Sequence, residues 1–129
     1  MQLNEALAFI DDSERGATLE LRHPVSGAPT GMKLVVAGPD SRTQRAARLA
    51  TADELSDLAR ADGTVSAEDR ERATIAGLAR CILCWEIIED GEALPLTHSA
   101  ACRLLSVSWA REQVDAFAGN RANFVGGQK

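Results

Sequence analysis

The sequence predicts a mainly α-helical α+β fold: an N-terminal β-hairpin with an extended loop, packed on a bundle of about four helices. Strand-like alternation and turn residues are concentrated before Pro39, whereas helical periodicity dominates after it. The 129 residues and the absence of a long linker fit one domain. Its regions are residues 1–39 (hairpin), 40–125 (helices) and 126–129 (a flexible tail).

The N-terminal region supplies one short helix and the hairpin. The segment "MQLNEALAFIDD" places Leu3, Leu7 and Ile10 on one side of a helix. The runs Thr18–Arg22 and Met32–Ala37 flank a turn-rich segment and are expected to pair as two strands. Two strands alone are marginal in water, so the hairpin is expected to lie against helices.

Four helices are expected after Pro39, because capping and breaking residues punctuate the helical pattern. They run from Asp40 or Ser41 to about Ala59, from Ser66 to about Glu89, from Thr97 to Leu105, and from Ser108 to about Phe124.

Three cysteines and a histidine have the spacing of a small zinc site, namely Cys81, Cys84, His98 and Cys102. The competing interpretation is that the cysteines are buried thiols in the helix that begins at Ser66. Ile75, Leu78, Ile82 and Trp85 continue at helical spacing through the cysteine pair, and no Gly or Pro follows until Gly91. We therefore favour buried thiols, with a zinc-stabilised binding or regulatory module as the alternative.

The same predicted helix is apolar on more than one side. Cys81, Cys84 and Ile88 form a second stripe beside the first. Such a helix is either central in a bundle or has one face on its own core and another on a partner.

Composition and motifs exclude several classes of function. The net charge of -5 disfavours nucleic-acid binding, and Arg42, Arg45 and Arg48 are expected to form a solvated helix face. The segment around Asp62-Gly63 lacks the first carboxylates of a calcium loop. No catalytic arrangement, phosphate loop or apolar run of about 18 residues is present, so we expect no enzyme, no cofactor and no membrane span.

A diffuse pattern in the second half resembles the tail assembly chaperones of long-tailed bacteriophages. It comprises Trp85, Gly91, Leu94-Pro95-x-Thr97, Leu104-Leu105, Trp109, Gln113-Val114, Phe117 and Asn123-Phe124. The hairpin followed by a helix at Asp40-Ser41 is similar too, so the resemblance covers about Leu19 to Phe124.

The resemblance implies a non-enzymatic helper of phage or prophage tail assembly in the host bacterial cytoplasm. Such chaperones bind the tape measure protein, keep it soluble, help recruit the major tail tube protein and are absent from the mature virion. This chain would correspond to the short form, where a longer form arises by frameshifting. Neither nucleic acid nor membrane is implied as a partner.

Exposed apolar surface on a charged body is what such a role requires. The candidate partner-binding residues lie on the helix of the cysteines and on the last helix. They are Cys84, Ile88, Trp109, Val114, Phe117 and Phe124. Weak self-association along such faces would suit a protein that coats one long client.

Overall fold

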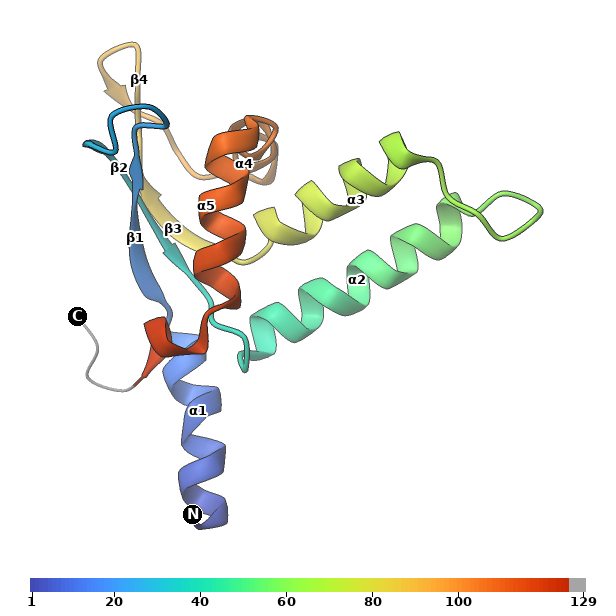
Figure 1. Ribbon diagram of the computed structural model, residues 1–129, viewed down its shortest axis with the longest axis horizontal. Coiled ribbons are helices and arrows are strands. Elements are labelled where there is room, and N and C mark those ends of the chain that lie inside the picture. The colour runs from blue at the N-terminus through green and yellow to red at the C-terminus, as the bar shows by residue number, and fades with distance from the viewer. Residues whose placement is uncertain (126–129) are drawn as a thin grey trace.

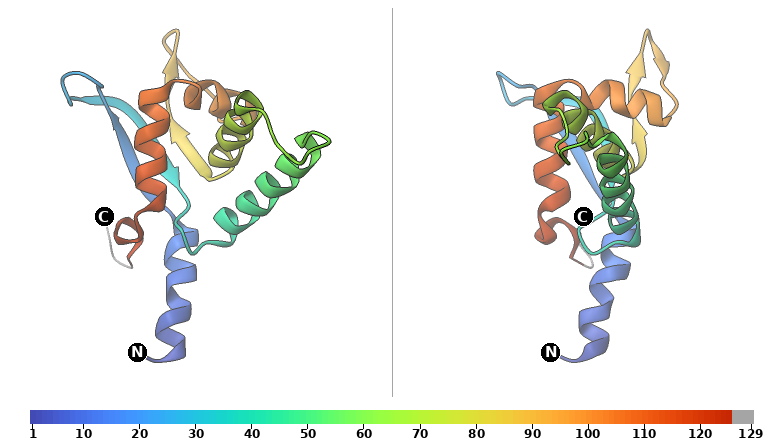
Figure 2. Two further views of the ribbon diagram at one scale, coloured as in Figure 1. Left: turned by 45° about the vertical axis from the view of Figure 1, so that its right-hand side comes forward. Right: turned by 90° about the vertical axis from the view of Figure 1, so that its right-hand side faces the viewer.

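Helices cover one face of a small antiparallel sheet, and the first helix extends away from this body (Figures 1 and 2). The structure is a computed structural model that describes residues 1–125; the predicted tail, 126–129, lies outside the described residues. Within that range the chain contains five α-helices, a three-stranded sheet and a small two-stranded hairpin, so the fold is α+β and mostly helical. The elements are α1 (Leu3–Arg15), β1 (Ala17–Arg22), β2 (Pro29–Val36), α2 (Arg42–Leu58), α3 (Ala67–Ala79), β3 (Ile82–Glu86), β4 (Ile88–Glu89), β5 (Glu92–Ala93), α4 (His98–Leu105), α5 (Ser108–Gly119) and a 3-10 helix, η1 (Arg121–Phe124).

The predicted hairpin is confirmed as β1 and β2, which pair antiparallel with Leu19 opposite Leu34. Its turn is closed by the His23 N–H, which donates to the Ala28 carbonyl at 2.8 Å. Burial alternates along β2, where Leu34 and Val36 are fully buried and Lys33 is exposed. One face of the sheet therefore lies on the core.

The prediction that the helix from Ser66 continues to about Glu89 is wrong. The helix α3 ends at Ala79, and the segment from Ile82 forms a third strand that pairs antiparallel with β2. Val36 lies opposite Ile82, and Leu34 lies opposite Trp85. Pairing with β2 outweighs helical spacing here, because the hairpin needs a third strand and Ile, Cys and Trp fit a strand well.

Asp90-Gly91 is a hairpin turn rather than the end of a helix. Both residues have positive φ, 53° and 79°, as a type I′ turn requires. The turn joins β4 to β5, with Ile88 opposite Ala93.

The predicted helix starts at Ser41, Ser66 and Thr97 are confirmed, since each side chain accepts a backbone N–H of the first turn. The last helix is shorter than predicted. It ends at Gly119, and Asn120 then caps the 3-10 helix that carries Phe124.

The core lies between the sheet and α2, α3, α4 and α5. Leucine and valine side chains of the sheet meet mostly small residues from the helices, which lets the helices approach closely. The most buried members are Leu21, Leu34, Val36, Ala47, Ala79, Ala101, Leu105, Ala110, Val114 and Ala118.

Candidate partner-binding surfaces

The six predicted partner-binding residues divide into exposed and interior positions. Ile88 is 67% exposed on β4, and Cys84 is exposed on β3. Trp109 and Phe117 are half-buried and pack against the core. Cys84 and Ile88 are therefore accessible, but they lie on the strands β3 and β4 and not on the predicted helix that begins at Ser66.

Val114 and Phe124 belong to the interior. Val114 is fully buried and Phe124 is 4% exposed. The rings of Phe117 and Phe124 meet edge to face, with centroids 5.6 Å apart. These residues therefore pack α5 and η1 against the rest of the protein. The helical spacing of the stripe is compatible with such a packing role as well as with partner binding.

An apolar hollow lies beside Ile88, beneath the β4–β5 hairpin. It has a volume of about 230 Å³, and its lining includes Trp85, Ile88, Leu94 and Leu104. The indole N–H of Trp85 donates to the Leu94 carbonyl at 2.8 Å, which fixes the ring in the hollow. We call this the hairpin hollow.

A salt bridge borders the hairpin hollow. The guanidinium of Arg103 on α4 lies 2.6 Å from the Glu89 carboxylate on β4. This contact ties the small hairpin to α4 across the hollow. The arrangement has the anatomy of a binding surface, with an apolar centre and a charged rim.

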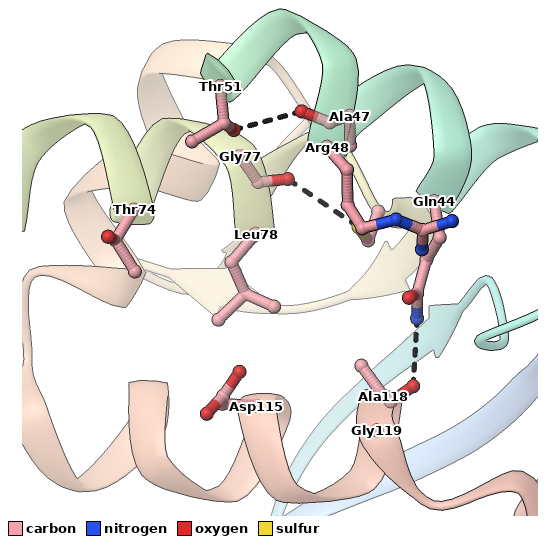
Figure 3. A pocket seen from close by; sticks show the side chains of 11 residues that line it. Gln44, Ala47, Arg48, Thr51, Thr74, Gly77, Leu78, Asp115, Ala118 and Gly119 are labelled. Atoms are coloured by element: carbon pink, nitrogen blue, oxygen red, sulfur yellow. Dashed lines mark hydrogen bonds between the residues drawn. The ribbon is translucent and has the colours of Figure 1, made fainter. Parts of the chain in front are cut away.

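A second cleft lies among α2, α3 and α5 and has a volume of about 300 Å³ (Figure 3). Its lining is mostly small or apolar, including Ala47, Gly77, Leu78 and Ala118. The Gln44 side chain closes one end by donating to the Ala118 carbonyl at 2.8 Å. We call this the interhelical cleft.

The first helix carries exposed apolar side chains that are not among the six predicted partner-binding residues. Leu3 is 74% exposed and Leu7 is 51% exposed. The sequence indicated that Leu3, Leu7 and Ile10 share one side. The sequence does not indicate that the N-terminal half of this helix extends away from the rest of the protein (Figure 1).

The C-terminal end of α1 is held by hydrogen bonds to the segment that leads into α2. The buried Ser13 accepts the Gly38 N–H at its carbonyl, 2.8 Å away. The Glu14 carboxylate accepts the Arg42 N–H at 2.7 Å and also the Thr43 hydroxyl. The Thr43 hydrogen bond is the largest cause that lowers the pKa of Glu14, so the carboxylate stays ionised at the start of α2.

The four residues of the zinc alternative are not brought together as a site. Among residues 1–125, no three His, Cys, Asp or Glu side chains form a group that could hold a metal ion. Only Cys102 and His98 approach each other, with Sγ and Nε2 at 3.5 Å. Cys81 is buried and donates to the Gly77 carbonyl, whereas Cys84 is exposed. The geometry thus gives the zinc alternative no support.

Burial also makes Cys81 a poor nucleophile. Desolvation raises the pKa of its thiol to about 11, against the smaller opposing effects of Arg48 and Arg80. The expectation of a buried thiol therefore holds for Cys81 and fails for Cys84.

Comparison with protein-family models, with curated proteins and with solved structures finds no match to this chain. In the part of the chain that the structure describes, no helix combines the length and apolar character needed to cross a bilayer.

Proposed function

We propose that this chain is a non-enzymatic tail assembly chaperone of a phage or prophage, acting in the host bacterial cytoplasm. In this role it binds the tape measure protein and keeps it soluble. It also helps recruit tail tube subunits, and it leaves before the virion is complete. The motifs from Trp85 to Phe124 that resemble this family suggest the class.

The observation that carries the proposal is the hairpin hollow with Ile88 exposed beside it. A large aliphatic side chain that is 67% exposed next to an apolar hollow offers a client a place to bury apolar surface. The salt bridge between Arg103 and Glu89 gives the surface a polar rim. A helical client can fit an apolar side chain into such a hollow and leave its polar side in water.

Co-expression with the tape measure protein encoded beside this chain tests the proposal. The wild-type chain should keep the client in the soluble fraction and co-purify with it. Ile88→Glu should send the client to the pellet, since the new charge would be desolvated in the complex.

Val25→Glu is the matched control. Val25 is 90% exposed in the β1–β2 loop, so the variant adds the same charge to a similarly exposed aliphatic position outside the hollow. It should behave as wild type. Absence of any complex with the neighbouring tape measure or tube protein would refute the proposed function, and equal behaviour of the two variants would refute the assignment to the hairpin hollow.

A further inference from the structure

The β4–β5 hairpin beside the hairpin hollow carries an excess of negative charge. Glu89, Asp90 and Glu92 are all exposed, and residues 87–93 include no base. Figure 1 shows this hairpin projecting beyond α4. Among the described residues that line the hollow, Arg103 is the only base. The rim of the hollow is therefore acidic on balance.

Two of these carboxylates belong to residues that are paired across the hairpin. Glu89 lies directly opposite Glu92, so the two side chains leave the same face of the ribbon, where like charges are destabilising. Arg103 relieves one of them, because its guanidinium lies 2.6 Å from the Glu89 carboxylate. Glu92 makes no salt bridge or side-chain hydrogen bond with any of residues 1–125. The pair therefore lacks one positive charge, which a partner can supply.

The apolar part of the surface lies next to this pair. Ile88 is 67% exposed and directly precedes Glu89, and both residues line the hollow of about 230 Å³. A client that places an aliphatic side chain in the hollow also covers its rim and removes water from the carboxylates there. An apolar or acidic segment would leave these carboxylates without compensation, which is unfavourable. A base close to the aliphatic side chain supplies the compensation.

We infer that the hairpin hollow selects a basic amphipathic helix of the client. An apolar side chain of this helix enters the hollow, and a lysine or arginine about one turn away lies beside Glu89 and Glu92. Residues three and four apart share a face of a helix, so one segment presents both groups. The inference rests on the proposed function, because it specifies which segments of the tape measure protein the hollow takes.

Synthetic peptides test this with the purified full chain. Three peptides of about 18 residues, or about five helical turns, share a leucine stripe and carry lysine, glutamine or glutamate beside it. Trp85 lines the hollow and is the only tryptophan in a Trp109→Phe background, so its fluorescence reports binding there. The lysine peptide should bind at least about tenfold more tightly than the glutamate peptide, with the glutamine peptide between them. Added salt should reduce the difference.

Glu92→Lys should reverse the preference. It places opposite charges across β4 and β5, which favours the hairpin, and circular dichroism and thermal unfolding verify the fold. This variant should bind the lysine peptide at least about fivefold more weakly than the wild type and the glutamate peptide more tightly.

Asp57→Lys is the matched control. Asp57 is exposed near the end of α2, outside the hollow, and its replacement changes the net charge by the same amount. Both affinities should stay close to those of the wild type. An equal effect of Glu92→Lys and Asp57→Lys would overturn the inference, because the total charge of the chain would then attract the peptide.

Equal affinities for the lysine and glutamate peptides, or no binding of any peptide, would also overturn the inference. These outcomes are distinct from those of the co-expression test. If the tape measure protein co-purifies while the peptides show no preference for lysine, only the inference fails. If the lysine peptide binds while neither the tape measure nor the tube protein forms a complex, only the proposed function fails.

Discussion

A methyl group on Gly77 of α3 would lie 2.3 Å from the hydroxyl oxygen of Thr51 on α2. The two helices thus approach closely because residue 77 has no side chain. Thr51 is fixed in this position by donating its hydroxyl to the Ala47 carbonyl at 2.9 Å. This contact sets how α2 and α3 pack beside the interhelical cleft.

Gly77→Ala is therefore expected to lower the free energy of unfolding by about 1–2 kcal/mol. Overpacking costs about 1–3 kcal/mol, and the better helix propensity of alanine offsets up to about 1 kcal/mol. In a Thr51→Ala background the overlap is gone, and Gly77→Ala should be neutral or stabilising. Urea unfolding of the four proteins measures the coupling, and an equal loss in both backgrounds would show that Thr51 is not the obstacle.

Truncation of Phe124 and of Ile88 is expected to change the free energy of unfolding by very different amounts. Phe124→Ala should lower the free energy of unfolding by about 3 kcal/mol or more, because a buried aromatic side chain leaves a cavity. Ile88→Ala should change it by less than about 0.5 kcal/mol, because this side chain is mostly in water. Chemical denaturation tests both, and a strongly destabilising Ile88→Ala would place that side chain in the core.

Asp40 should stabilise the fold in a pH-dependent way. Arg121 donates to both of its carboxylate oxygens, at 2.6 Å and 2.8 Å, and this hydrogen bonding is the main cause that lowers the pKa of Asp40 below its ordinary 3.8. Because the pKa of Asp40 is lower in the folded chain than in the unfolded chain, ionised Asp40 stabilises the fold. This stabilisation is complete above the unfolded-state pKa of 3.8 and is lost as the pH falls through the folded-state pKa.

The measurement compares the free energies of unfolding of the wild type and Asp40→Asn across pH. The difference should be constant at neutral pH and shrink once the pH falls below 3.8. Asp53→Asn, at an exposed position of α2, serves as the control. A difference that is unchanged into the acid range would show that the Arg121 contact does not favour ionised Asp40.

Thiol labelling should follow exposure. At pH 8 an alkylating reagent should modify Cys84 first and half-buried Cys102 more slowly. Cys81 should react only on unfolding, because it is buried and its pKa of about 11 leaves little thiolate. Mass mapping at successive times gives the order, and labelling of Cys81 as fast as Cys84 in folded protein would contradict the burial of Cys81 between α3 and β3.

Local signals predicted the parts of the fold that depend on local chemistry. Ser41, Ser66 and Thr97 each cap a helix through a hydrogen bond within the next turn, so the sequence was sufficient to place these helix starts. The hairpin was predictable for the same reason, since alternation and turn residues are adjacent in the chain.

The third strand was not predictable in this way. A short apolar run such as "CILCW" is compatible with either a helix or a strand, and its partners Leu34 and Val36 lie far back in the sequence. The dipeptide Asp90-Gly91 is compatible with a helix end as well as with a hairpin turn, and the helical spacing before it favours the helix end. With β3 recognised, the same dipeptide indicates a type I′ hairpin.

The exposure of the candidate partner-binding residues could not be predicted either, because it too depends on contacts between distant parts of the chain. Helical spacing places Trp109, Phe117 and Phe124 in one apolar stripe, flanked by Val114. Spacing does not indicate which of these side chains are buried, and only the packing shows that Val114 and Phe124 are. Leu3 and Leu7 were recognised as one side of a helix, but whether that side is covered depends on where the rest of the chain folds.

The position of β3 in the chain has a consequence for synthesis on the ribosome. The hairpin of β1 and β2 emerges first, yet one edge of β2 pairs with residues that are made only after α2 and α3. Until Ile82–Glu86 leaves the exit tunnel, Leu34 and Val36 are paired with β1 but lack their β3 partners, Trp85 and Ile82. During this time the edge of β2 that later pairs with β3 is open. A chain stalled before residue 82 should therefore be sensitive to protease and prone to aggregate.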